Sequence, residues 1–85
     1  METTKKALEN IVDILYKGEV TKGIAMMSEV IPSLAIIAEK IEDEDLKDRY
    51  VNDGLRQALE AMETNDGVLL ADVLSYEIIE IIDLL

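Results

Sequence analysis

The chain has no cysteine and no histidine among its 85 residues, and each absence removes a class of chemistry. Without cysteine there can be no disulfides, thiolate zinc sites, iron–sulfur clusters or thiol nucleophiles. Without histidine, the commonest general base and the commonest metal ligand are missing as well. The lack of cysteine suits a reducing compartment. Basic residues are also scarce, with 8 lysines and arginines against 19 aspartates and glutamates.

The remaining residues form no recognisable catalytic arrangement. A di-iron helical bundle needs Glu-x-x-His motifs, and the chain has no histidine. Phosphate binding commonly uses a P-loop or a Gly-x-Gly-x-x-Gly motif, and the chain has neither. The acidic run Glu42–Asp45 lacks the glycine and glutamate spacing of an EF-hand calcium loop. We therefore expect no enzymatic activity, no catalytic residue, no cofactor and no metal site.

The net charge is −11, and residues 41–85 carry nearly all of it, with −6 over 41–66 and −4 over 67–85. A surface of this sign repels phosphate backbones and anionic lipid headgroups. We therefore expect no direct binding of nucleic acid and no membrane association. The opening residues, METTKKALEN, lack the apolar core of a signal peptide, so a cytoplasmic location is expected.

Apolar periodicity predicts four helices, over about residues 4–17, 20–41, 44–63 and 67–85. The second contains Pro32, which cannot donate a backbone hydrogen bond. The apolar stripe keeps its phase across Pro32, so we favour one helix kinked near this residue, with a break there as the alternative. The predicted fold is all-α, a single domain over residues 1–85 forming a small antiparallel bundle of four helices.

The third helix has an apolar stripe and a second strip of smaller residues. Helical spacing predicts the following core stripe: Val51, Leu55, Ala58, Leu59 and Met62. Tyr50, Gly54 and Ala61 lie off this stripe. Gly54 costs ~1 kcal/mol relative to alanine in a helix interior, so it is either tolerated on the solvent side or permits close approach of another group.

The segment Thr64–Gly67 predicts a turn in which Asp66 caps the last helix. Because this connection is short, the third and fourth helices should form an antiparallel hairpin. Asp72 and Glu77 could pair with Arg49 or Arg56 across that hairpin, or with basic residues of a partner.

Residues 67–85 contain no basic residue, and their apolar arc covers close to half of the helix circumference. Such a helix is either enclosed by its own bundle or shared with a second molecule. We favour a shared surface, as a homodimer or with another protein. The predicted interface consists of side chains at or beyond the edge of the main apolar face: Val73, Tyr76, Glu77, Ile79 and Leu84.

The residues 58–63, then 69–72, then Tyr76 and Glu77, read ALEAME, LLAD and YE. This pattern, over residues 58–78, resembles a segment found in small uncharacterised bacterial helical proteins. The resemblance implies a helical hairpin in a bacterial cytoplasmic protein. It implies no activity, ligand or functional residue.

These observations favour a non-enzymatic helical protein–protein interaction module. It is expected to use the apolar surface of its last helix to engage a basic or amphipathic helix of another protein, in the manner of a chaperone. The alternative is an acidic nucleic-acid mimic that occupies the binding site of a basic protein. The two hypotheses differ in salt dependence, because a carboxylate mimic relies on exposed charges that salt screens.

Overall fold

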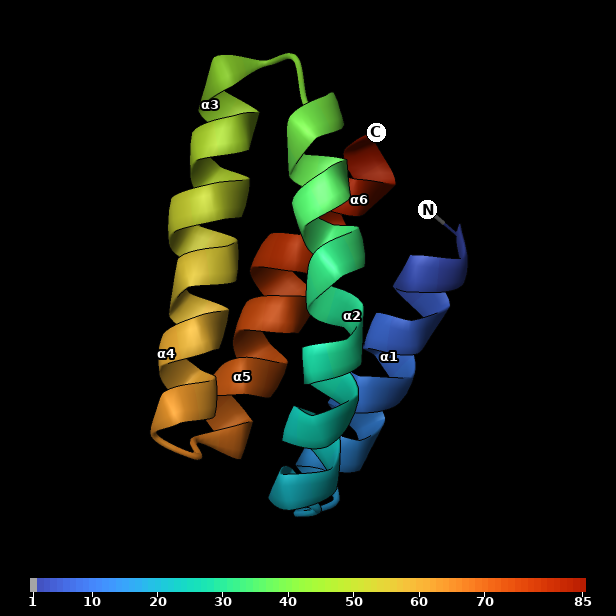
Figure 1. Ribbon diagram of the computed structural model, residues 1–85, viewed down its shortest axis with the longest axis vertical. Coiled ribbons are helices and arrows are strands. Elements are labelled where there is room, and N and C mark those ends of the chain that lie inside the picture. Colours follow the sequence, from blue (N-terminus) through green and yellow to red (C-terminus); the bar gives the residue numbers. More distant parts are fainter. Residues whose placement is uncertain (1) are drawn as a thin grey trace.

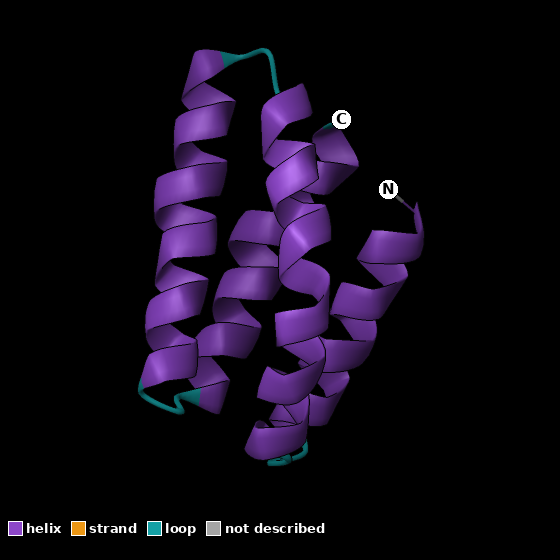
Figure 2. Ribbon diagram, viewed as in Figure 1, coloured by secondary structure: helices purple, strands orange, loops and turns teal. Residues whose placement is uncertain are grey.

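The computed structural model describes residues 2–85, which form four helical rods joined by short turns (Figure 1). Helix α1 spans Glu2–Tyr16, and helix α2 spans Val20–Lys40. The third rod (residues 44–63) is built from α3 (Glu44–Asp48), the π-helical segment η1 (Arg49–Arg56) and α4 (Gln57–Glu63). The C-terminal rod (residues 67–84) is built from α5 (Gly67–Val73), the π-helical segment η2 (Leu74–Ile79) and α6 (Glu80–Leu84). Residues 2–85 contain no strand, so the predicted all-α bundle is confirmed (Figure 2).

The turns use the residues that the sequence offers for them. Gly18, with φ +87°, follows α1 in the left-handed conformation that glycine adopts without steric cost. Asn65 also has positive φ, at 55°, and the side chain of Asp66 accepts a hydrogen bond of 3.0 Å from the amide of Leu69. The cap at Asp66 and the hairpin between the third rod and the C-terminal rod are therefore as predicted.

Helix α2 continues through Pro32, so the predicted continuous helix is confirmed over the alternative of a break. Proline removes one hydrogen bond from a helix interior, and packing must compensate for the loss. Met27 and Leu34, which lie on either side of Pro32, are both fully buried at 0% exposure. Burial on both sides of the proline therefore holds α2 together.

The third rod buries a different face from the one that periodicity predicts. The buried face combines one tyrosine with three small residues: Tyr50, Gly54, Ala58 and Ala61. Four of the five predicted core residues are half-buried or exposed: Val51, Leu55, Leu59 and Met62. The predicted stripe is only partly right, since Val51, Leu55 and Met62 pack against the edge of the core and Leu59 is exposed. The buried face is shifted because close packing against the C-terminal rod requires small side chains, whereas hydrophobicity favours the larger ones.

Two contacts explain this orientation of the third rod. A Cβ atom added at Gly54 would overlap Cδ1 of Ile78, so the glycine allows η1 and η2 to lie close together. The close-approach interpretation of Gly54 is thus confirmed. On the same face, the hydroxyl of Tyr50 donates a buried hydrogen bond of 2.9 Å to the carbonyl oxygen of Leu34 on α2. Tyr50 is therefore held between two neighbouring rods.

The C-terminal rod lies at the centre of the bundle, in contact with α1, α2 and the third rod. Seven of its apolar side chains are buried: Leu70, Ala71, Val73, Leu74, Ile78, Ile81 and Ile82. Val73 is only 5% exposed, so the prediction that it lies outside the packed face is wrong. The breadth of the apolar arc reflects contact with three rods, which needs a wider face than contact with two.

We predict that Gly54→Leu destabilises the fold by about 1–3 kcal/mol, because the new side chain overpacks the contact between η1 and η2. The matched control is Gln57→Leu, an exposed position on the same rod, which should change stability by no more than about 0.5 kcal/mol. Urea unfolding followed by circular dichroism measures both. Equal stability of the two variants would contradict the close approach of the two rods.

We predict that the stability difference between the wild type and Tyr50→Phe narrows at high pH. Burial raises the pKa of Tyr50 well above its ordinary value, so the unfolded chain releases the phenolic proton at a lower pH than the folded protein does. The contribution of Tyr50 to the free energy of unfolding is therefore fully present below pH ~10. Above that pH it declines by ~1.4 kcal/mol per pH unit. Phenylalanine does not titrate and lacks this decline.

The measurement is urea unfolding of both proteins between pH 8 and pH 11. At pH 8 the wild type should be more stable by about 1 kcal/mol because of the hydrogen bond to Leu34. A difference that stays constant across this range would mean that Tyr50 ionises in the folded state as readily as a free tyrosine.

Candidate functional site

The structure places the five predicted interface residues in different environments. Tyr76 and Leu84 are exposed, at 62% and 65%, whereas Val73 is buried at 5%. Glu77 is half-buried and forms an ion pair with Arg49 on the third rod. Ile79 is half-buried and lines a groove. Only Tyr76, Ile79 and Leu84 are therefore free to meet a partner in this arrangement.

Arg49 holds the Glu77 carboxylate against the third rod, at the surface of the hairpin. Its Nε lies 2.7 Å from Oε2 of Glu77, and its guanidinium also donates to the carbonyl oxygen of Tyr76 at 3.1 Å and to Glu80 at 3.4 Å. The predicted pairing of Arg49 with Glu77 is confirmed. This network fastens η1 to η2 beside the Gly54 contact, and so it serves the hairpin.

A groove runs between α1 and the C-terminal rod. The two are antiparallel, since Lys5 near the start of α1 meets Asp83 near the end of the C-terminal rod, at 2.6 Å. At the other end of α1, the hydroxyl of Tyr16 donates a hydrogen bond to Oδ1 of Asp72. We call these two contacts the clasps. With a helical rise of 1.5 Å per residue, the clasps lie about 16 Å apart along α1.

The groove lies between the clasps by position along both helices, and its volume is about 390 Å³. Its lining comes from both helices: Glu9, Val12, Asp13, Ser75 and Ile79. Val12 and Ile79 are half-buried and pack against the core, so they form an apolar floor. Glu9 and Asp13 are exposed and form an acidic edge on α1. The groove is therefore amphipathic, with apolar surface beside negative charge.

Two exposed tyrosines mark the Asp72 end of the groove. Tyr16 is 53% exposed and Tyr76 is 62% exposed. The hydrogen bond to Asp72 raises the pKa of Tyr16 above its ordinary value, and the nearby Tyr76 adds to this effect. Ser75, which also lines the groove, acts in the opposite direction and lowers the pKa of Tyr16.

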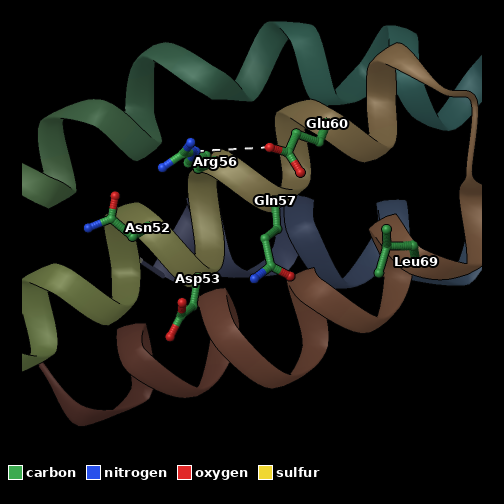
Figure 3. A pocket seen from close by; sticks show the side chains of 6 residues that line it. All are labelled: Asn52, Asp53, Arg56, Gln57, Glu60 and Leu69. Atoms are coloured by element: carbon green, nitrogen blue, oxygen red, sulfur yellow. Dashed lines mark ion pairs between the residues drawn. The ribbon is translucent and has the colours of Figure 1, made fainter.

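A second hollow, of about 320 Å³, lies on the surface of the third rod next to α5 (Figure 3). Its lining is almost entirely polar: Asn52, Asp53, Arg56, Gln57, Glu60 and Leu69. Arg56 and Glu60 form an exposed ion pair of 3.9 Å across part of it. This hollow has no apolar floor, and Leu69 alone offers apolar surface, so it is a weaker candidate than the groove.

Helix α2 is long and apolar enough to cross a membrane, by length and composition alone. An 18-residue window within Val20–Lys40 has a mean hydropathy of 1.4, and 22% of it is buried inside the bundle. A single such helix is weak evidence, because core helices of soluble proteins pass the same test. The middle of its exposed side carries small or apolar residues around the single acid Glu29: Ala25, Ser28, Pro32, Ser33, Ala35 and Ile36.

Within residues 2–85, no group of three or more aspartates and glutamates is arranged to hold a metal ion. Every buried side-chain oxygen and nitrogen in this part of the chain has a hydrogen-bond partner. Neither finding points to a reaction centre in the described residues.

The described residues form a small all-α bundle with an amphipathic groove on its surface. The chain belongs to the family described as a domain of unknown function, DUF8042, which it matches over residues 1–85. The match covers the whole chain, whereas the resemblance noted in the sequence covers residues 58–78. No curated protein and no solved structure matches the chain. Family membership brings no assigned activity.

Of the residues that line the groove, the sequence predicted Ile79 and missed Ser75 and the side that lies on α1. Ile79 and Tyr76 were among the predicted interface residues. Glu9, Val12 and Asp13 were not, although two carboxylates four residues apart beside an apolar residue are a visible signal on a helix. That signal has meaning only once α1 is known to lie next to η2.

We predict that Asp72→Asn lowers the pKa of Tyr16. The carboxylate of Asp72 accepts a hydrogen bond from the Tyr16 hydroxyl and disfavours the phenolate by its charge, and an amide does neither as strongly. The measurement is a pH titration of the tyrosine ring carbons by NMR, with Tyr16 assigned by comparison with Tyr16→Phe. A Tyr16 pKa that is unchanged by Asp72→Asn would show that this clasp does not form in solution.

Proposed function

We propose that the protein is a non-enzymatic helical interaction module that binds an amphipathic segment of another protein in the groove between α1 and the C-terminal rod. The observation that carries this proposal is the groove itself, an apolar floor of Val12 and Ile79 beside the exposed carboxylates of Glu9 and Asp13. Docking of an amphipathic helix in a groove is a common mode of protein recognition.

The dimensions of the groove suit a short segment. A volume of about 390 Å³ accommodates a few side chains, and the lining from Glu9 to Asp13 covers about 6 Å of α1, roughly one helical turn. Because one wall belongs to the buried C-terminal rod, that part of the floor is held in place before a partner arrives. Preorganisation of this kind lowers the entropic cost of binding.

The proposed partner has a charge opposite to that of the groove. A second copy brings its own net charge of −11 toward Glu9 and Asp13, which opposes self-association through this surface. A homodimer would more readily use the outward side of α2, where Ala25, Pro32 and Ile36 are exposed around a single acid, Glu29. The proposal therefore assigns the groove to a different protein, whose apolar helix face it would cover as a chaperone does.

The alternative function, an acidic nucleic-acid mimic, is favoured by a separate observation. All four acidic residues of Glu42–Asp45 are exposed and stand at the junction of α2 and α3. A mimic would bind its partner through carboxylates such as these, and its affinity would fall steeply with salt. Groove docking relies partly on the apolar floor, so its affinity should depend less on salt.

We predict that Ser75→Arg blocks partner binding, since the long side chain would lie across the groove and neutralise part of its acidic edge. Ser33→Arg makes the same chemical change on the exposed side of α2 and serves as the matched control. Tagged wild-type protein and both variants are used for affinity purification from extracts of the native cell, followed by quantitative mass spectrometry. Thermal unfolding verifies that all three baits are folded.

The expected result is a protein that copurifies with the wild type and Ser33→Arg, and is reduced at least tenfold with Ser75→Arg. The proposal is wrong if every copurifying protein is recovered equally with the two variants. Loss of partners with Glu42→Gln/Asp45→Asn, but not with Ser75→Arg, would instead support the nucleic-acid mimic.

A further inference from the structure

We propose that the groove selects a cationic helix, in which two basic side chains one turn apart flank an apolar side chain. This inference rests on the proposed function and adds the chemistry of the partner. The basic side chains would pair with Glu9 and Asp13, and the apolar side chain would pack on Val12 and Ile79.

The first step concerns which carboxylates are free. Asp72 and Asp83 lie at the two ends of the groove and are engaged in the clasps with Tyr16 and Lys5. Within residues 2–85, Glu9 and Asp13 form no ion pair with a basic side chain. The acids available to a partner are therefore the two in the middle, and they stand beside the apolar floor.

The second step concerns spacing. Glu9 and Asp13 are four residues apart on α1, so their Cβ atoms lie about 5–6 Å apart on one side of the helix. Val12 is half-buried next to them and faces the groove together with Ile79. A partner helix that carries basic residues at i and i+4 repeats this spacing and presents the apolar residue at i+3 to the floor.

The third step concerns why the occupant is a helix. An extended segment places alternate side chains about 7 Å apart and could also reach both carboxylates. It would, however, need hydrogen-bond partners for its own backbone. Both walls of the groove are helices, whose backbone groups are largely paired internally, so they provide few such partners. A helix satisfies its own backbone and avoids this cost.

The fourth step excludes a second copy of this chain as the occupant. Its basic residues are Lys5, Lys6, Lys17, Lys22, Lys40, Lys47, Arg49 and Arg56. No two of them are three or four residues apart, so no helix of the chain offers the required pair. Charge and spacing therefore both point to a partner of a different sequence.

The test measures binding of fluorescein-labelled, hydrocarbon-stapled 14-residue peptides by fluorescence anisotropy at 50 mM and 200 mM salt. The first peptide carries lysines at i and i+4 beside a leucine at i+3. The second has the same composition with the lysines moved to i and i+2, and the third has glutamates in place of the lysines. The proteins are the full-length wild type, Glu9→Gln/Asp13→Asn and the control Glu42→Gln/Asp45→Asn.

The control also removes one glutamate and one aspartate carboxylate, but from an exposed acidic segment away from the groove. We expect the first peptide to bind the wild type and the control alike, and to bind Glu9→Gln/Asp13→Asn about tenfold more weakly, as two exposed ion pairs allow. The second and third peptides should bind the wild type at least tenfold more weakly than the first. Circular dichroism verifies that the variants are folded.

Three results would overturn the inference: equal binding of the first and second peptides, equal binding of the first peptide to the two double variants, or no binding of the first peptide to the wild type. These results leave the proposed function standing if Ser75→Arg still removes a native partner, because the groove would then bind a segment of different chemistry. If Ser75→Arg has no effect on native partners or on the first peptide, the groove itself is not the docking surface.

Discussion

The C-terminal rod packs against each of the other three rods, and most other features of the structure depend on this arrangement. It contributes more buried side chains than any other rod, and the glycine at position 54 allows the third rod to approach it closely. Arg49 fastens the same pair of rods from the surface, through Glu77. A rod enclosed in this way cannot offer its whole apolar face to a partner. Apolar surface remains exposed at both ends of the rod, at Val68, Leu69, Leu84 and Leu85, and the strip of η2 beside α1 lines the groove.

The acidic residues near the groove serve two different purposes. Net charge alone describes a solvated surface that keeps a small protein soluble. In the structure, the carboxylates near the groove fall into two groups, those used in contacts between α1 and the C-terminal rod and those left beside apolar side chains. The second group, Glu9 and Asp13, combines charge with adjacent apolar surface. That combination distinguishes a recognition surface from general solvation.

Features that depend on neighbours in sequence were predictable, and features that depend on distant contacts were not. The helices and the turn at Asp66 follow from local spacing, and the Arg49–Glu77 pair follows from the hairpin that this short turn forms. The buried face of the third rod depends on how Gly54 meets Ile78, which no local pattern specifies. The α1 side of the groove depends on contacts such as the one between Tyr16 and Asp72, which are 56 residues apart. Single-sequence periodicity carries no information about that pairing.

The central position of the C-terminal rod also has a consequence for synthesis of the protein. This rod is the last of the four in chain order, so α1, α2 and the third rod leave the ribosome before the element that they pack against. Until residues 67–82 emerge, apolar side chains such as Leu8, Ile11 and Leu34 have no complete core to enter. The nascent chain must therefore complete its fold late, and its exposed helices are open to chaperones or to premature association until then.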